Sequence, residues 1–268
     1  GATGTTKVSS NAFYGCSKLA AIEFPNSITS IGSSALYGCS SLRKVVFGEN
    51  LRSVGSDALG YCNTLDTIVW NVKTFSISSY DYSPLYTVRY QIKSFTFGPK
   101  VETIPAYLCR NMSYINAPIV IPESVTSIGN EAFYGCSSIP SLTLNKTIKN
   151  YNGEFYGCSG LKSVYYTGTI EEWCGITFNN SSSNPLYYAK NLYINNNLAT
   201  EINIPSSITS IGAYQFQGAT CLTKVTLPST ITSVGANAFY GCTNLESINL
   251  GATGTTKVSS NAFYGCSK

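Results

Sequence analysis

The chain has 268 residues, of which 43% are hydrophobic and only 11% are charged, and its net charge is +4. This weak charge, with no run of Lys or Arg, argues against nucleic acid or an anionic membrane as the main partner. The sequence contains no histidine, which excludes Ser-His-Asp and Cys-His catalysis and mixed Cys/His zinc sites. No apolar run reaches the roughly 20 residues that cross a bilayer, so no membrane insertion of this segment is expected.

A short motif recurs from one end of the chain to the other. Its fullest form is Ile-Thr-Ser-Val-Gly-Ala-Asn-Ala-Phe-Tyr-Gly-Cys at 231–242, and close copies begin at Gly32, Gly129 and Val258. The cysteines of successive copies are spaced by about 23 residues, a period found in leucine-rich repeats and β-solenoids. The repeat therefore predicts one solenoid over residues 1–268, with about ten to eleven coils.

Copies of the motif are followed by an apolar segment of the form L-x-x-[IV]-x-[FLI], as in Leu42, Val45 and Phe47. The last two apolar positions alternate with a polar one, which predicts a short β-strand in every coil. Prolines that directly follow such segments end the strand, because proline has no N–H to donate to a neighbouring strand. The Thr-Ser-Ile-Gly segment forms a return leg, and the Ala-Phe-Tyr-Gly segment is predicted to be a single helical or 3₁₀ turn.

Two segments depart from the pattern, near 71–91 and 167–200. Both are predicted to be variant coils with a longer outer leg.

Residues 1–18 and 251–268 are identical, which fits either a natural duplication in a longer array or the place where the chain was cut. The last copy stops without a polar capping repeat, so we expect an excerpt of a longer protein. Its uncapped terminal coils are a candidate surface for end-to-end self-association.

Seven of the ten cysteines occupy the same phase of the repeat and are predicted to stack as a ladder of buried, reduced thiols. They are Cys16, Cys39, Cys62, Cys136, Cys158, Cys242 and Cys266. Cys109, Cys174 and Cys221 lie outside this phase, and the sequence leaves open whether they form disulfides. No Cys-x-x-Cys pair is present, so no metal site is predicted, and no cofactor is expected.

The pattern [IV]-T-S-[IV]-G-x-x-A-F-x-G-C, followed by L-x-x-[IV]-x-[LIF]-P, resembles the BspA-type leucine-rich repeat of bacterial and some protist surface proteins. The resemblance covers nearly the whole chain. It implies a mostly β solenoid with a parallel sheet on the concave face and short strands with 3₁₀ or helical turns on the convex side. It also implies an adhesin-like role, because its better-studied members resemble adhesins that bind host matrix proteins or other bacteria.

Two surfaces are candidate binding sites. The polar positions of the predicted strands face the concave side of the sheet and supply Arg43, Lys44, Lys93, Lys162, Tyr165 and Lys224. The aromatic residues of the variant coils supply Tyr80, Tyr82, Trp173, Tyr187 and Tyr188, since tyrosines offer contact area at a low ordering cost. The alternative for these aromatic residues is that most of them fill the enlarged core of their coils.

From these features we expect a non-catalytic, extracellular or cell-surface adhesion module that binds protein or glycan. The partners would be matrix, plasma or microbial surface macromolecules. Two alternatives stay open. The repeats fit a purely structural spacer, which would bind no ligand. They also fit a carbohydrate-active β-solenoid enzyme, although such an enzyme needs clustered Asp or Arg and the 13 acidic residues here are scattered.

Overall fold

The protein is a mostly β parallel solenoid, as the repeat predicted, and its coils fall into two compact units, Gly1–Ile139 (unit 1) and Pro140–Lys268 (unit 2). The structure is a computed structural model that describes residues 4–250 and 257–268. Residues 1–3 and 251–256, which belong to the two identical terminal segments, lie outside the described residues. The two units are described separately, and the prediction of one domain over 1–268 stays a prediction.

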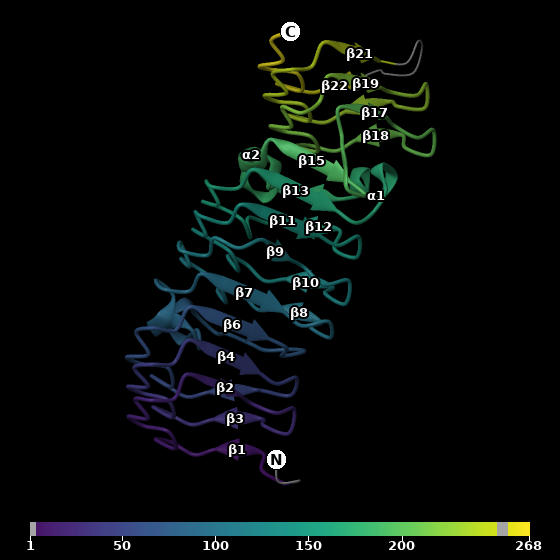
Figure 1. The fold of residues 1–268 in the computed structure, drawn as a ribbon. Coiled ribbons are helices and arrows are strands. Elements are labelled where there is room, and N and C mark those ends of the chain that lie inside the picture. The colour runs from purple at the N-terminus through teal and green to yellow at the C-terminus, as the bar shows by residue number, and fades with distance from the viewer. Residues whose placement is uncertain (1–3, 251–256) are drawn as a thin grey trace. The chain divides into compact units, whose positions relative to one another are not determined.

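In unit 1 the predicted strands form a parallel sheet in the order β2–β4–β6–β7, with β9 following along the chain (Figure 1). Their bounds are β2 Ala21–Glu23, β4 Lys44–Phe47, β6 Thr67–Trp70, β7 Ser94–Phe97 and β9 Ile119–Val120. Equivalent residues lie side by side, so that Val45 pairs with Ile68 and Phe47 with Trp70. All four are buried. The alternating pattern therefore builds a continuous core from equivalent positions.

In unit 2 the corresponding strands form two sheets, in the orders β11–β13–β15–β16 and β17–β19–β21. The first comprises β11 Ser141–Leu144, β13 Ser163–Tyr166, β15 Asn191–Ile194 and β16 Asn197–Leu198. The second comprises β17 Glu201–Asn203, β19 Lys224–Thr226 and β21 Ser247–Asn249. All pairs are parallel except β15–β16, an antiparallel hairpin whose turn residues Asn195 and Asn196 have φ of 48° and 64°. Asparagine tolerates this left-handed conformation better than most residues.

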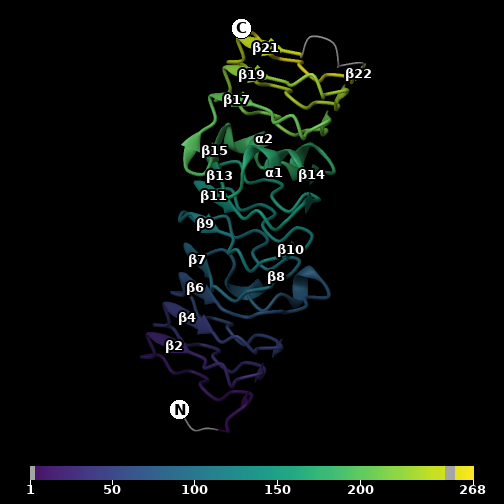
Figure 2. The same cartoon turned by 90° about the vertical axis from the view of Figure 1, so that its right-hand side faces the viewer.

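The return legs form short parallel ladders on the opposite side of each unit from the longer strands (Figure 2). In unit 1 they comprise β1 Lys7–Val8, β3 Ser30–Ile31, β5 Ser53–Val54, β8 Thr103–Ile104 and β10 Ser127–Ile128. In unit 2 they comprise β12 Asn150–Tyr151, β14 Thr177–Phe178, β18 Ser210–Ile211, β20 Ser233–Val234 and β22 Lys257–Val258. Their orders are β1–β3–β5 and β8–β10 in unit 1, and β12–β14 and β18–β20–β22 in unit 2. The sequence pattern indicated an apolar pair here, and the structure makes it a strand of two residues.

The Ala-Phe-Tyr-Gly segment is a set of hydrogen-bonded turns in the standard coils, and this corrects the prediction of a helical or 3₁₀ turn there. A left-handed residue lies on each side of the Ala-Phe-Tyr core of the turn, for example Glu131 (φ 55°) and Gly135 (φ 71°). Helices need negative φ at every position, so these two residues stop one from forming. Alternate N–H groups of the turn instead donate to the next coil, as from Leu36 to the Ala58 carbonyl at 2.8 Å.

Helices occur in the two variant coils. The 3₁₀ helices are η1 Tyr80–Tyr82, η2 Tyr86–Val88 and η3 Ser181–Ser183, and the α-helices are α1 Ile170–Cys174 and α2 Leu186–Ala189. Helix α1 begins with a capping box in which the Thr169 hydroxyl accepts from the Glu172 N–H and the Glu172 carboxylate accepts from the Thr169 N–H. Such a box satisfies two backbone donors of a helix too short to be stable alone.

All ten cysteines, each of which lies in the described part of the chain, are free thiols. Five of the seven ladder thiols donate to the carbonyl of the Phe-position residue in the preceding coil. Cys16 is exposed, so the prediction of a buried thiol is wrong at this position. Cys39 donates to Phe13 at 3.2 Å and Cys242 to Phe216 at 3.2 Å. Cys136 donates in the same way to the carbonyl of Cys109 at 3.0 Å. Cys109 therefore occupies the Phe position of its coil. Burial raises the pKa of the Cys62 thiol to about 12, which keeps it protonated as a donor.

Candidate functional site

The outward positions of the long strands in unit 1 carry three of the predicted binding residues. Arg43, Lys44 and Lys93 are all exposed and lie at or just before β4 and β7. The Arg43 guanidinium lies 3.9 Å from the carboxylate of Asp66 on the neighbouring coil. Such an exposed pair is worth at most about 1 kcal/mol and leaves the face available to a partner. The structure thus leaves all three cations exposed at or next to the starts of β4 and β7, and their role in binding stays a prediction.

The outward face of β13 and β15 in unit 2 carries a pair of stacked tyrosines. Tyr165 pairs in register with Tyr193, and their ring centroids lie 4.5 Å apart with an interplanar angle of 17°. Both rings are half-buried. Their register neighbours on this face, Ser163 and Asn191, are small and polar. The pair is therefore the main aromatic feature of the β13–β15 face.

Of the other two predicted cations in unit 2, Lys162 is exposed just before β13. Lys224 on β19 lies 3.7 Å from the Glu201 carboxylate on β17, and both side chains are largely exposed. Lys224 and Lys162 thus belong to different sheets of unit 2. Tyr165 lies on β13 and Lys162 just before it, while Lys224 lies with a compensating acid on the other sheet.

The aromatic residues of the unit 1 variant coil divide into two groups. Tyr80 is half-buried, and the Arg110 guanidinium lies over its ring at 4.5 Å. A second guanidinium, that of Arg89, lies 3.8 Å over the Tyr86 ring. Cation–π contacts of this kind hold η1 and η2 against the coil. Tyr82, by contrast, is 77% exposed, so of the two predicted residues it is the one that offers its ring to a ligand.

In the unit 2 variant coil the prediction for Trp173 is wrong, because this side chain is fully buried and offers no surface to a ligand. It packs against Tyr166 and Phe178, which fits the alternative that variant-coil aromatics fill an enlarged core. Tyr188 is half-buried, and its hydroxyl accepts from the Gly157 N–H at 2.9 Å. Tyr187 is 43% exposed and is the candidate of this coil that remains on the surface.

Polar residues replace the buried alanine of the standard turn in the two coils that flank this variant coil. Gln215 takes that position on one side, and Asn184 of the variant coil donates to its carbonyl at 3.1 Å. Glu154 takes it on the other side, is 4% exposed, and accepts from the Asn152 N–H at 2.7 Å. Burial raises the pKa of the Glu154 carboxyl above its ordinary value, since a charged form loses hydration in the interior.

Replacing Glu154 by glutamine is expected to change how stability depends on pH. The folded state holds the Glu154 proton to a higher pH than the unfolded state does. Wild-type stability relative to Glu154→Gln should therefore be greatest at low pH and fall as pH rises through the raised pKa. Thermal unfolding of both proteins between about pH 4 and 8 measures this difference. Parallel curves would contradict the prediction, and Glu102→Gln, at an exposed position, is the control.

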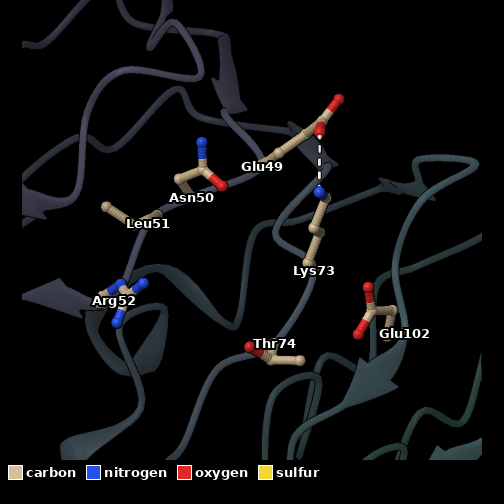
Figure 3. A pocket seen from close by; sticks show the side chains of 7 residues that line it. All are labelled: Glu49, Asn50, Leu51, Arg52, Lys73, Thr74 and Glu102. Carbon is tan, nitrogen blue, oxygen red and sulfur yellow. Dashed lines mark ion pairs between the residues drawn. The ribbon is translucent and has the colours of Figure 1, made fainter.

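A polar hollow of about 230 Å³ lies at the turn between the two ladders of unit 1 (Figure 3). Glu49 in its lining lies 3.6 Å from Lys73 and 3.0 Å from Lys100. Arg52 and Glu102, which also line the hollow, form no ion pair among the described residues. The hydrogen bond and charge of Lys100 lower the pKa of the Glu49 carboxyl. This hollow is therefore ion-paired only in part, and Arg52 and Glu102 leave one charge of each sign in its lining.

Sequence analysis did not name Tyr193 as a site residue and missed that it completes the pair with Tyr165. The signal was present, since Asn191-Leu192-Tyr193-Ile194 repeats the strand pattern of Ser163-Val164-Tyr165-Tyr166. The intervening insertion breaks the regular period, so the register of the two strands could not be counted.

The family model described as the BspA type leucine rich repeat region matches residues 6–116, 85–199 and 187–268. The chain belongs to this family. The resemblance of its repeat motif is thereby confirmed over nearly its whole length. This BspA-type chain gave no match among curated protein sequences.

Solved structures similar to this BspA-type chain include a leucine-rich repeat protein from Bacteroides ovatus, 19% identical over 97% of this chain and 80% of that one, with a TM-score of 0.46. A leucine rich cell surface protein from Faecalibacterium prausnitzii is 19% identical over 98% and 81%, with a TM-score of 0.35. The T. pallidum leucine rich repeat protein is 20% identical over 62% and 79%, with a TM-score of 0.45. Family membership rests on the sequence match.

No helix among the described residues is long and apolar enough to cross a membrane.

Proposed function

We propose that this chain is a non-catalytic binding module, displayed on a cell surface or secreted, that adheres to host or microbial surface proteins. The observation that carries the proposal is the stacked pair of Tyr165 and Tyr193 on the outer face of β13 and β15. The extracellular setting is supported by the low charge and by the resemblance of the repeat to those of surface proteins.

The tyrosine pair has the properties of an interface anchor. Tyrosine is enriched among the residues that dominate binding energy, and such residues cluster within surroundings that contribute little themselves. The two rings are held by each other at 4.5 Å, so they lose little side-chain freedom when a partner binds. Serine and asparagine around them leave the rings accessible, and exposed lysine at Lys162 adds a cation at the margin.

The test is binding of the purified chain to a panel of matrix proteins, plasma proteins and host glycans. Tyr165→Ala with Tyr193→Ala should weaken a saturable interaction by about 2 kcal/mol, roughly 30-fold in Kd. The matched control is Tyr240→Ala with Tyr264→Ala, which removes a second stacked pair, at 5.3 Å, from a turn of the same unit. This control should leave Kd unchanged.

A second variant separates the tyrosines from the cations of the sheet faces. It carries Lys44→Glu, Lys93→Glu, Lys162→Glu and Lys224→Glu, and we expect a smaller loss of affinity than for the tyrosine pair. Loss of binding in this variant with full binding in the Tyr165 and Tyr193 double variant would overturn the tyrosine site. Absence of binding across the whole panel would overturn the proposal and favour the spacer role.

A further inference from the structure

Three tyrosines on successive coils of unit 1 stack on one another at the Ala-Phe-Tyr turn. The ring centroids of Tyr14 and Tyr37 lie 5.1 Å apart, and those of Tyr37 and Tyr61 lie 4.9 Å apart. Tyr14 is 58% exposed and Tyr61 is 65% exposed, while Tyr37 between them is half-buried. The three rings are therefore positioned by contact with one another and lie within reach of a dissolved reagent.

The backbone of the third coil is strained in order to place Tyr61 in this stack. In the standard coils the residue before the ladder cysteine is a glycine in the left-handed conformation, as is Gly38 (φ 74°). The third coil reverses the order to Gly60-Tyr61, so that a tyrosine adopts the left-handed φ of 57°. A bulky residue rarely does so, and such strain is concentrated at functional sites.

The reversed order also makes room for the neighbouring ring. A Cβ at Gly60 would lie 2.8 Å from Cδ2 of Tyr37, so a tyrosine at position 60 would collide with that ring. With glycine at 60 and tyrosine at 61, the two rings lie side by side instead. The strained position and the open one thus serve the same contact between Tyr37 and Tyr61.

The hydroxyl edges of these two rings meet. Desolvation, the electrostatic influence of Tyr61 and a hydrogen bond that the Tyr37 hydroxyl donates to the Tyr61 hydroxyl all raise the pKa of Tyr37. The ring planes are inclined at 47° rather than stacked in parallel. Hydroxyls in contact bring the ortho carbons beside them close together. These are the carbons at which two phenoxyl radicals join.

The nearest ladder thiols are protected from the same oxidants. Cys39 and Cys62, on the coils of Tyr37 and Tyr61, are both buried. Burial raises the pKa of the Cys62 thiol to about 12, and a protonated thiol is a poor nucleophile and is slow to oxidise. The phenols of Tyr37 and Tyr61 are therefore the accessible oxidisable groups of these two coils.

We propose that Tyr37 and Tyr61 are a cross-linking site, at which hydrogen peroxide and a haem peroxidase join neighbouring coils through a carbon–carbon bond between the two rings. Each phenol loses one electron and its hydroxyl proton to become a phenoxyl radical. The radicals couple at their ortho carbons, and the hydrogens of those carbons leave as protons while the oxygens regain protons. The two electrons and two protons removed in total reduce one hydrogen peroxide to two waters.

The inference rests on the proposed extracellular setting only for the source of peroxide. The experiment adds its own peroxide and peroxidase to the dilute full chain, so it fails or succeeds independently of the binding assay. Tyr37 and Tyr61 are the single tyrosines of the tryptic peptides 19–43 and 53–73. Mass spectrometry should find these peptides joined, lighter by two hydrogen atoms than their sum. Absence of this product would overturn the proposal.

Exposure alone is tested by Tyr82, which is 77% exposed and stacks on no ring in the described part of the chain. It lies in the tryptic peptide 74–89. We expect the link between 19–43 and 53–73 in higher yield than any link from 74–89 to another peptide. An equal or higher yield for 74–89 would show that accessibility governs the reaction, and would overturn the site.

Variants give the same answer through single atoms. Tyr37→Phe keeps the ring but cannot form a phenoxyl radical, so it should abolish the link to 53–73. Tyr61→Gly restores the residue of the standard coils and should abolish the link without lowering the thermal stability, because it relieves the left-handed tyrosine. The matched control Tyr82→Phe removes a more exposed phenol and should leave the yield unchanged. A wild-type amount of cross-linked 53–73 in Tyr37→Phe would contradict the pairing.

Discussion

Replacing Trp173 by alanine should lower the free energy of unfolding of unit 2 by about 3–5 kcal/mol, the range for removing a large aromatic from a core. The Trp173 side chain is fully buried. Its ring packs against Tyr166 at 5.3 Å and Phe178 at 5.6 Å between centroids. Its indole N–H donates to the Gln215 carbonyl at 3.1 Å, and the Gln215 amide donates back to the Trp173 carbonyl. One residue thus joins α1 to the following coil.

The measurement is chemical denaturation followed by circular dichroism. Tyr187→Ala removes an exposed aromatic from the same variant coil and should change stability by less than about 0.5 kcal/mol. Trp173→Phe keeps most of the ring and removes the N–H, so it isolates the hydrogen bond and should cost about 1 kcal/mol. A Trp173→Ala protein with the midpoint of the wild type would contradict the assignment of this residue to the core.

The repetitive part of the fold was predictable because it is local. Within one coil the spacing of Leu42, Val45 and Phe47 already indicates which residues point inward, and the structure buries all three. Because the repeat has a regular period, each of these residues lies beside the residue at the same position of the next coil, as Val45 lies beside Ile68. The turn was less predictable, because one residue in it adopts left-handed backbone, as Glu131 and Asn237 do. Asparagine tolerates this conformation, but glutamate at the same position gives no such signal.

The candidate sites were only partly predictable because they depend on insertions. The 167–200 segment interrupts the period, so sequence spacing alone did not reveal that Tyr193 returns to the register of Tyr165. The same interruption hid the burial of Trp173, whose partner Gln215 is supplied by a later coil. Only the folded chain brings such residues together.

Replacing Gly129 by alanine should destabilise unit 1 by about 1–3 kcal/mol, the usual cost of overpacking. A Cβ at this position would lie 2.3 Å from the backbone nitrogen and 2.7 Å from the Cα of Ala106 in the preceding coil. Those are backbone atoms, so the clash is relieved only by moving a whole coil. The Gly129 N–H also donates to the Ile104 carbonyl at 2.8 Å, and the same movement would stretch this bond.

The glycine is required by close approach of coils rather than by backbone conformation. The equivalent Gly32, Gly55 and Gly235 would place a Cβ 2.4–2.5 Å from a backbone nitrogen of the preceding coil. Thermal unfolding of Gly129→Ala, with Asn130→Ala at the adjacent exposed position as control, measures the effect. Equal stability of the two variants would contradict the close packing of coils. A larger loss of stability for Gly129→Ala would identify this glycine as the residue that sets the distance between successive coils at the return leg. Because each coil is one continuous segment, this distance also keeps the long strands, and the side chains on their outward faces, in register.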